Sequence, residues 1–311
     1  MNQNVPLAQA GDTWRRMAER VAGQHWPEAT LYVVATPIGN LGDLGLRAWQ
    51  ALTQADVIAA EDTRSSRSLL DAWGIGTPLM AAHRHNEAAA AQDICQRLEQ
   101  GQRIALVSDA GAPAVSDPGA RIVRAVRDAG YAVVPVPGPS AVITALMGSG
   151  VTSDENPAYA FAGFAPHKAA ARQRWLRSWC ALPAPVVMFE SPHRLSAMLA
   201  DLLEVCGEQR ELTIARELTK RFEQIVTLPV AQAAAWLAED AHRAQGEFVL
   251  IVHAAADAAD DEHPDDPATI VLLDALLETL SVRDTAKVAA KVTGQPRDAL
   301  YALALARKAN T

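Results

Sequence analysis

The stretch LVSDAGAPAVSDPGARIVRAVRDAGYAVVPVPGPSAVITALM, residues 106–147, decides the fold class of this chain. An apolar run ends in a polar loop that carries Asp109, and a helix pattern follows. A second apolar run at residues 132–136 ends in a Pro-Gly-Pro-Ser loop that opens another helix. Asp117 is expected to cap the first of these helices, with Pro118 at its first position. Strand, loop and helix in repeated order predict a parallel sheet, whose ligands bind beyond the carboxyl ends of the strands, where both loops lie.

The same pattern extends toward the N-terminus. Polar loops that each follow an apolar run occur at residues 36–40, 61–64, 83–87 and 108–113. Parallel strands bring such loops to one edge of the sheet, and small residues in them let backbone groups approach a ligand closely. A nucleotide-like cofactor is therefore expected, although neither a G-x-G-x-x-G fingerprint nor a phosphate-binding GK[ST] motif occurs. Asp109 either accepts hydrogen bonds from such a ligand or caps the turn after its strand, and the pattern alone does not separate the two.

The pattern changes after residue 150, where a polar connector suits a domain boundary. Five further apolar runs with helix patterns between them follow, and two closely spaced runs after residue 212 suggest a hairpin and a mixed second sheet. An acidic Ala/Asp/Pro stretch then leads to short helix patterns joined by a Gly turn, as in a helix-turn-helix. The predicted parts are an N-terminal extension (1–29), an N-terminal α/β domain with a parallel sheet (30–138), a C-terminal α/β domain with a mixed sheet (139–254), an acidic linker (255–268) and a C-terminal helical unit (269–311).

Composition bounds the class of protein. Half of the 311 residues are hydrophobic and no window is apolar enough for a membrane span, so a membrane protein is not expected. The first residues lack the pattern of a signal peptide, and the three cysteines are odd in number and far apart, which favours free thiols in the cytoplasm. The net charge of −8 speaks against nucleic-acid binding, but basic clusters at residues 167–177 and 216–221 leave a local basic face open.

Three polar segments are candidates for chemistry. His83 and His85 alternate like metal ligands, but no third ligand is spaced to complete a site, so hydrogen bonding at the surface is favoured and no metal is expected. Residues 190–194 (ESPHR) end one strand and open a helix, and Glu190, His193 and Arg194 are left for a cleft. Residues 216–220 (RELTK) directly follow an apolar strand, where charge is costly unless paired, although a solvated charge run is an equal alternative. The G-x-S-x-G motif of serine hydrolases is absent.

Together these loops resemble the ribosomal RNA small-subunit methyltransferase I family of the tetrapyrrole methylase superfamily, whose members methylate a cytidine 2′-hydroxyl of 16S rRNA. The resemblance runs from about residue 31 to residue 307. The residues that carry it are Thr36-Pro37-Ile38-Gly39-Asn40-Leu41, Ala59 to Arg64, His83, His85-Asn86-Glu87, Leu106 to Gly111, Asp117-Pro118-Gly119, Val136-Pro137-Gly138-Pro139, Phe189-Glu190-Ser191, His193-Arg194, Ala215 to Lys220, Glu247, Val249-Leu250-Ile251 and Ala299-Leu300-Tyr301.

The resemblance implies two α/β domains with the active-site cleft between them, S-adenosylmethionine in that cleft, a homodimer, and 16S rRNA or the small ribosomal subunit as partner. Carried over by position, the cofactor contacts would be Pro37, Gly39, Asp109, Ala110, Gly111, Val115, Thr144, Ala145 and Phe189. Two residues depart from the family pattern. Ala112 stands where the family usually has Thr, which removes one hydroxyl contact, and Arg84 stands where an acid is common, which makes the cleft rim more positive.

Transfer to a ribose hydroxyl requires that two reactants be positioned and that the hydroxyl be activated by a base. The candidates for this chemistry are Glu61, Asp62, Glu190, Glu217 and Lys220, and replacement of Glu217 by alanine is expected to abolish transfer while cofactor binding stays near normal. The candidates for RNA contacts are Arg64, His83, His85, Arg194 and Arg216, with the arginines on phosphates.

Two alternatives remain open at this point. One keeps the fold and methylates a tetrapyrrole or another small molecule. The Pro37 loop speaks against it, because the porphyrin-methylating relatives carry a G-x-G-P-G-D type of first loop. The other is a non-catalytic RNA-binding assembly factor, against which the intact polar loops at all four strand ends speak. The C-terminal helical unit either docks RNA or acts as a lid or dimer brace.

Overall fold

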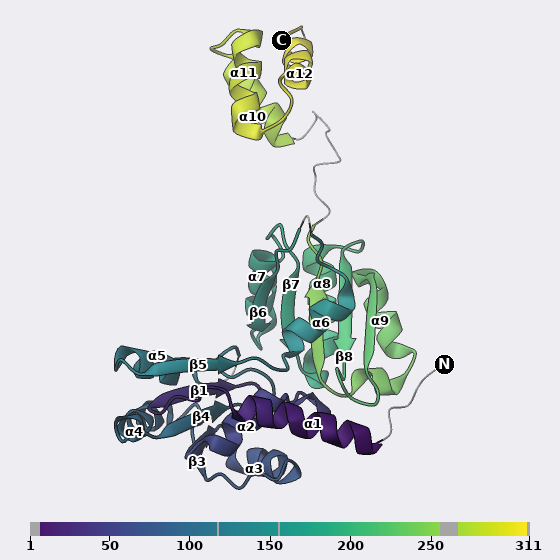
Figure 1. The fold of residues 1–311 in the computed structure, drawn as a ribbon. Coiled ribbons are helices and arrows are strands. Elements are labelled where there is room, and N and C mark those ends of the chain that lie inside the picture. The colour runs from purple at the N-terminus through teal and green to yellow at the C-terminus, as the bar shows by residue number, and fades with distance from the viewer. Residues whose placement is uncertain (1–6, 117, 155, 256–266, 310–311) are drawn as a thin grey trace. The chain divides into compact units, whose positions relative to one another are not determined.

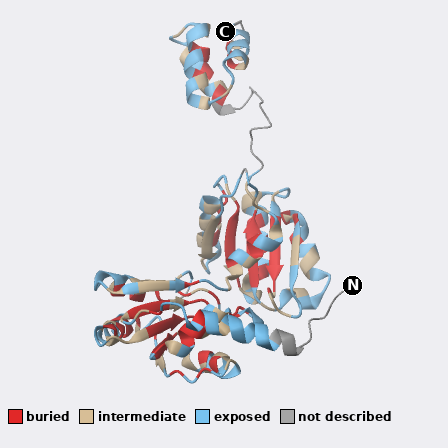
Figure 2. Ribbon diagram, viewed as in Figure 1, coloured by how far each residue is buried: buried red, intermediate tan, exposed pale blue. Residues whose placement is uncertain are grey.

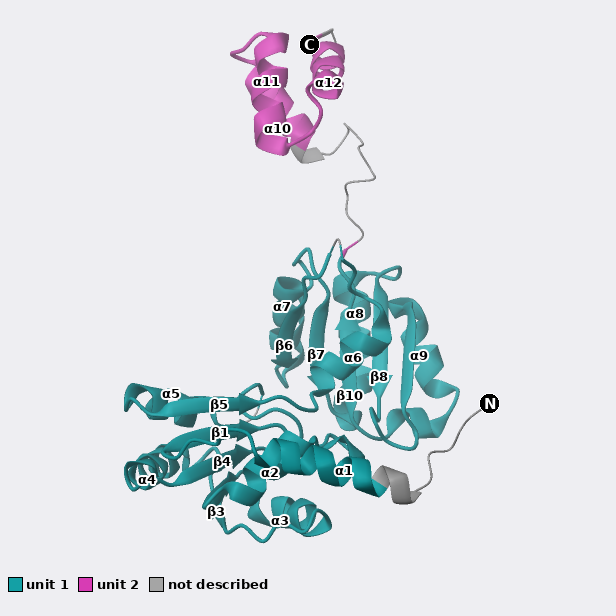
Figure 3. Cartoon of the chain, viewed as in Figure 1, with its two compact units in different colours: residues 1–254 teal, residues 255–311 magenta. Residues whose placement is uncertain are grey.

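The computed structural model describes residues 7–116, 118–154, 156–255 and 267–309 and forms two compact units, residues 1–254 and 255–311 (Figure 3). The first unit holds two five-stranded sheets, and the second is helical (Figure 1). None of the helices among the described residues is long and apolar enough to cross a membrane.

The first sheet is parallel throughout, as the sequence predicts. Its strands run in the order β3-β2-β4-β1-β5. They are β1 (Thr30–Val34), β2 (Val57–Ala60), β3 (Leu79–Ala81), β4 (Arg103–Val107) and β5 (Ala132–Val136). The helices between them are η1 (Leu41–Asp43), α2 (Leu46–Gln54), α3 (Thr63–Ala72), α4 (Glu87–Glu99) and α5 (Ala120–Asp128).

Apolar residues line both faces of this sheet, because successive strand side chains point to opposite sides. Tyr32 and Val34 pack with α2 and α3, whereas Leu31 packs with α4 and α5. The strands β1, β2 and β4 are accordingly buried along most of their length, whereas the edge strands β3 and β5 are partly exposed (Figure 2). The loops at their carboxyl ends therefore all open on one edge of the sheet.

The second sheet is mixed, again as predicted, with the order β6-β7-β10-β8-β9. Only β6 and β7 pair in parallel. Its strands are β6 (Ala160–Phe164), β7 (Val186–Glu190), β8 (Glu211–Arg216), β9 (Gln224–Pro229) and β10 (Phe248–Val252). The helices of this half are α6 (Ala141–Ser149), α7 (Ala169–Trp179), α8 (Pro192–Cys206), α9 (Val230–Ala238) and η2 (Ala241–Ala244).

The two halves of the first unit share one apolar cluster. Helix α6 packs Val142, Ala145 and Leu146 against one face of the second sheet. Ile38, from the loop after β1, belongs to the same cluster, together with Leu218 from the loop after β8. Loops of both sheets consequently meet beside the N-terminal end of α6.

One predicted helix start is wrong. Helix α5 begins at Ala120, and Gly119 is its N-cap with φ 130°, so Pro118 is not the first helical position. A φ in this region favours glycine. The Gly119 N–H donates to Glu87 Oε1 at 2.9 Å, just ahead of the helix. The predicted capping residue Asp117 lies outside the described residues, as does most of the predicted acidic linker.

The chain has helices at both ends beyond the two sheets. Helix α1 (Leu7–Ala22) is longer than the helical stretch that the sequence predicts around residues 14–21. Trp26 after it donates its indole N–H to the Val21 carbonyl at 3.0 Å. The second unit consists of α10 (Pro267–Leu277), α11 (Val282–Thr293) and α12 (Arg297–Ala309) around an apolar core that includes Leu273 and Leu300. Gly294 ends α11 in the left-handed conformation, as the predicted Gly turn requires.

Candidate functional site

A cleft of about 340 Å³ lies where the loops of the two sheets meet. Most of its wall is apolar and aromatic, and a few polar groups converge on it, which is typical of a small-molecule site. The lining residues are Ile38, Ala110, Gly111, Ala112, Val115, Ser116, Ser140, Ala141, Val142, Phe164, Phe189, Glu190, Ser191, Pro192, Leu218, Glu247, Phe248 and Val249. Four of the predicted cofactor residues, Ala110, Gly111, Val115 and Phe189, are among them.

Backbone hydrogen bonds hold the loop after β4 against the loop after β1. The N–H groups of Thr36 and Gly111 donate to each other's carbonyls at 2.9 and 3.0 Å. Gly111 has φ 79°, so a side chain there would be strained, although its Cβ would make only an ordinary contact of 3.4 Å with Ile38 Cγ2. The glycine therefore allows the backbone conformation that this part of the wall requires.

Asp109 uses its carboxylate within the protein. Its Oδ1 accepts the backbone N–H of Asp62 at 3.1 Å and so ties the loop after β4 to the loop after β2. Asp62 in turn caps α3 by accepting the Arg64 N–H at 2.8 Å, and these hydrogen bonds lower the pKa of the Asp62 carboxyl. The Arg64 side chain is almost fully exposed.

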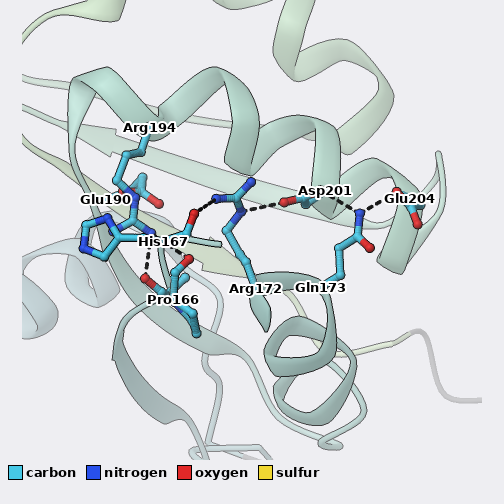
Figure 4. A network of polar contacts seen from close by, with 9 residues as sticks. Pro166, His167, Arg172, Gln173, Glu190, Arg194, Asp201 and Glu204 are labelled. Atoms are coloured by element: carbon cyan, nitrogen blue, oxygen red, sulfur yellow. Dashed lines mark hydrogen bonds and ion pairs between the residues drawn. The ribbon is translucent and has the colours of Figure 1, made fainter. Parts of the chain in front are cut away.

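Glu190 is the buried acid of the cleft. Its Oε1 accepts the Ser191 N–H at 2.8 Å and lies 3.3 Å from Arg194 Nε, while its Oε2 is buried without a hydrogen-bond partner among the described residues. Arg194 also donates to the carbonyls of Ala165 and Pro166 (Figure 4). A buried acceptor without a partner is costly, so the structure leaves one oxygen of Glu190 for a donor on a ligand.

A second acid–base cluster lies at the other side of the cleft. Lys220 Nζ donates to Glu217 Oε1 at 2.8 Å and to Glu247 Oε2 at 2.7 Å, and the Glu247 N–H donates to Glu217 Oε1 at 3.0 Å. Glu217 has φ 51° and Thr219 has φ 66°, so this turn is held in a conformation that L-residues seldom adopt. The Lys220 stem covers Gly39, where a Cβ would lie 2.6 Å from Lys220 Cγ.

The charges of this cluster reinforce one another. Partial burial raises the pKa of the Glu217 carboxyl, but hydrogen bonds from Lys220 and from the Glu247 N–H outweigh it, and the pKa is lowered. Burial lowers the pKa of Lys220, but its bonds to Glu217 and Glu247 outweigh it, and the pKa is raised. Lys220 is therefore a cation at neutral pH, and in this state it cannot accept a proton.

Glu247 connects the cleft to a neighbouring groove. That groove contains the predicted residues Pro37, Gly39, Asp109 and Lys220, and it shares Ile38, Ala110 and Glu247 with the cleft as common walls. A ligand in the cleft and a second ligand in the groove would thus meet beside the Lys220 ammonium.

Other predicted site residues lie elsewhere. Glu61 lines a third groove together with Arg84, Arg121 and Arg124, which adjoins the cleft through Ser116. Thr144 and Ala145 do not line the cleft, because α6 presents its first residues, Ala141 and Val142, there and turns Ala145 into the apolar cluster it shares with the second sheet.

Three predicted RNA contacts have partners within the protein. Arg216 is only 6% exposed, and its guanidinium donates to the Gln245 carbonyl at 2.8 Å and to Gln224 Oε1 at 3.0 Å, so it braces the β8–β9 hairpin. His83 and His85 lie edge to face with ring centroids 6.1 Å apart. Within the described ranges, no three His, Cys, Asp or Glu side chains are placed to hold a metal ion.

Glu247 is the residue that sequence reasoning missed. It directly precedes the fully buried strand β10, and a charged residue at the end of such a strand was the available signal. Its partner Lys220 lies 27 residues earlier in the chain, and only the antiparallel pairing of β8 with β10 brings the two together.

Comparison with known proteins now gives the class. Residues 30–234 match the family model described as Tetrapyrrole (Corrin/Porphyrin) Methylases, and residues 263–308 match the model described as RsmI C-terminal HTH domain. The two sheets and the cleft between their loops are therefore those of a tetrapyrrole methylase, followed by a helix-turn-helix unit.

Full-length relatives narrow the class to one family. The chain is 44% identical to "Ribosomal RNA small subunit methyltransferase I" of Vibrio cholerae serotype O1, covering 87% of this chain and 92% of the relative. It is 44% identical to the protein of the same name from Escherichia coli O157:H7, with 89% and 95% covered, and 45% identical to that of Xylella fastidiosa, with 88% and 97% covered. The chain belongs to the ribosomal RNA small subunit methyltransferase I family and is a methyltransferase.

Solved structures show the same fold at low identity. Diphthine synthase aligns with a TM-score of 0.57 at 13% identity, covering 72% of this chain and 90% of that chain. The methyltransferase CobJ aligns with a TM-score of 0.54 at 19% identity, covering 73% and 94%. These likenesses support the architecture of the first unit.

Proposed function

We propose that this protein transfers a methyl group from S-adenosylmethionine to the 2′-hydroxyl of a cytidine in 16S rRNA of the small ribosomal subunit. The observation that carries the proposal is the joint match to full-length relatives of that name and to the C-terminal domain model. The placement of a protonated lysine between two carboxylates, where the cleft meets its neighbouring groove, supports a reaction at a hydroxyl.

The cleft fits the cofactor. S-adenosylmethionine supplies an electrophilic sulfonium methyl group when it is bound. Ala110, Gly111 and Val115 would hold it from the first sheet, and Phe189 from the second, in an apolar space. The free oxygen of Glu190 is an acceptor for an amino or hydroxyl group of the cofactor. A uroporphyrin-III C-methyltransferase from Thermus thermophilus, complexed with S-adenosylhomocysteine, has the same fold, with a TM-score of 0.50 at 18% identity, and covers 72% of this chain and 98% of that chain.

The groove beside Lys220 would receive the ribose. The Lys220 ammonium stabilises negative charge on a hydroxyl oxygen placed against it, since a fixed cation in a partly buried site costs no reorganisation. Glu247, whose side chain is 78% exposed and lines both hollows, is the carboxylate best placed to accept the hydroxyl proton. Glu217 fixes Lys220 and is a positioning residue.

Two properties of the family complete the proposal. We infer a homodimer, which agrees with the exposed apolar side chains of Ile143 and Met147 on α6 and is tested by light scattering of the purified chain. The ribosomal substrate places the reaction in the cytoplasm.

The test is methyl incorporation from labelled S-adenosylmethionine. Small ribosomal subunits from a strain that lacks the enzyme are expected to accept label, whereas a uroporphyrinogen substrate is not. Label in the tetrapyrrole alone would replace the proposal by small-molecule methylation. Binding of the subunits without any label in either substrate would leave a non-catalytic assembly factor.

A further inference from the structure

A further groove, distinct from those beside Lys220 and Glu61, adjoins the cofactor cleft on the side of α7. It has a volume of about 520 Å³ and shares Phe164 and Ser191 with the cleft as common walls. We call it the aromatic groove. Its side chains are Phe164, Pro166, His167, Trp175, Ser191 and Arg194.

Two arginines hold the backbone of the loop that lines the aromatic groove. Arg194 donates to the carbonyls of Ala165 at 2.6 Å and Pro166 at 3.3 Å, and Arg172 donates to the next carbonyl, that of His167, at 3.2 Å (Figure 4). Three consecutive carbonyls are thus satisfied by buried or half-buried guanidinium groups. The loop is therefore fixed before any ligand arrives.

The charges of these arginines are already compensated. Arg172 Nε lies 2.5 Å from Asp201 Oδ2, with both side chains buried, and Arg194 pairs with Glu190. The guanidinium groups consequently act within the protein, and the surface that the groove offers is aromatic. Phe164 is 56% exposed although its ring packs edge to face on Phe189, with centroids 5.4 Å apart.

Trp175 supplies the second ring. It is half-buried against the core of the second sheet, and this packing fixes its orientation. Its ring also lies beside that of Trp179, with centroids 6.0 Å apart. Flat aromatic faces held in this way bind unpaired nucleobases by stacking. Lys168, just before α7, and Arg174, within it, are exposed and form no ion pair within the described part of the chain, so both are available to backbone phosphates.

We propose that the aromatic groove binds an unpaired nucleobase of the RNA substrate and holds the strand beside the cofactor cleft. The inference rests on the proposed function, because it deepens the recognition of the same substrate. It assigns Trp175 and His167 to RNA binding, and it assigns Arg172 to positioning of the loop.

The test compares two tryptophans of one helix. Trp175→Leu removes the ring that lines the groove and keeps apolar volume. Trp179→Leu is the matched control outside the groove. His167→Ala changes an exposed residue of the groove that does not belong to the hydrophobic core. Each full-length variant is titrated with fluorescein-labelled single-stranded oligocytidine, with a duplex RNA of equal length, and with S-adenosylhomocysteine. Thermal unfolding is recorded for all of them.

Trp175→Leu is expected to weaken single-strand binding about tenfold. A loss of affinity of this size is typical when one base–aromatic stack is removed. His167→Ala should weaken it less, and Trp179→Leu should leave it unchanged. Binding of the duplex should stay at the wild-type level in every variant, because paired bases cannot stack on the groove. Binding of S-adenosylhomocysteine should also stay at the wild-type level.

Three results would overturn the inference. Unchanged single-strand binding by folded Trp175→Leu and by His167→Ala would show that no base uses the groove. An equal loss on duplex RNA would reduce the site to an electrostatic contact. A parallel loss of S-adenosylhomocysteine affinity would assign the groove to the adenine of the cofactor. None of these measurements requires methyl transfer, so failure of the proposed function would be seen separately in the incorporation assay.

Discussion

Replacement of Glu217 by alanine removes the anchor of Lys220 without touching the cofactor cleft. Glu217 Oε1 accepts two hydrogen bonds, from Lys220 Nζ at 2.8 Å and from the Glu247 N–H at 3.0 Å. The variant leaves Lys220 bound only to Glu247, whose side chain is 78% exposed and correspondingly mobile. Lys220 therefore keeps its charge but loses its fixed position.

The size of the effect follows from the bond that is lost. A hydrogen bond between charged groups contributes about 1.5–3 kcal/mol, which corresponds to a fall in kcat of about 10- to 150-fold if transfer depends on the position of Lys220. The affinity for S-adenosylhomocysteine should stay near normal, because Glu217 does not line the cleft. This expected loss is smaller than the abolished transfer predicted from the sequence, because Lys220 keeps its hydrogen bond to Glu247.

The assay combines kcat on small ribosomal subunits with calorimetric titration of S-adenosylhomocysteine. Glu223→Ala is the matched control, because Glu223 lies in the same β8–β9 connection and its carboxylate accepts, among the described residues, only the Thr219 N–H at 2.6 Å. The pH profile gives a second readout. Since Glu217 helps to raise the pKa of Lys220, its removal should move the loss of rate at high pH toward lower pH. A wild-type kcat together with an unshifted alkaline limb would refute this role of Glu217.

Three further predictions concern the two ends of the cleft and the second sheet. Gly39→Ala would place a Cβ 2.6 Å from Lys220 Cγ at φ +154°, so transfer should fall while cofactor affinity is retained, and an unaffected kcat would contradict the contact. Glu190→Ala leaves the half-buried charge of Arg194 uncompensated and should lower the free energy of unfolding by about 3 kcal/mol in urea, whereas an unchanged midpoint would show that the pair is dispensable. Burial lowers the pKa of His253, so the unfolded chain binds more protons and stability should fall as the pH drops below 6.5. His253→Gln should show a smaller fall, and an equal fall in both proteins would assign the effect to other groups.

Much of the fold could be predicted because it depends on local patterns. Apolar runs and the polar or Gly/Pro loops after them define strands and their ends, and parallel order then places the four polar loops on one edge. The start of α5 was misjudged because Pro118 satisfies the local rule for a first helical residue, whereas the Glu87 carboxylate, 32 residues earlier, binds the Gly119 N–H ahead of the helix.

The candidate site was harder, because its polar partners are distant in sequence. Arg216 reads as part of an exposed charge run, yet its pairing opposite Phe248 buries it inside the second sheet. Glu217 adopts a positive φ although it is not glycine, and no local sequence pattern predicts this conformation. Lys220 meets Glu247 only through tertiary structure.

The central claim is that a cytidine ribose in 16S rRNA is the methyl acceptor, and its most direct test is to locate the transferred group. Small subunits from a strain lacking the enzyme are incubated with this protein and labelled S-adenosylmethionine, and the extracted 16S rRNA is partially hydrolysed in alkali. A methyl on the 2′-oxygen blocks attack on the adjacent phosphodiester, so label should coincide with one alkali-resistant bond after a cytidine. Label in a nucleotide that alkali still cleaves normally, or an RNA that carries no label, would contradict the claim.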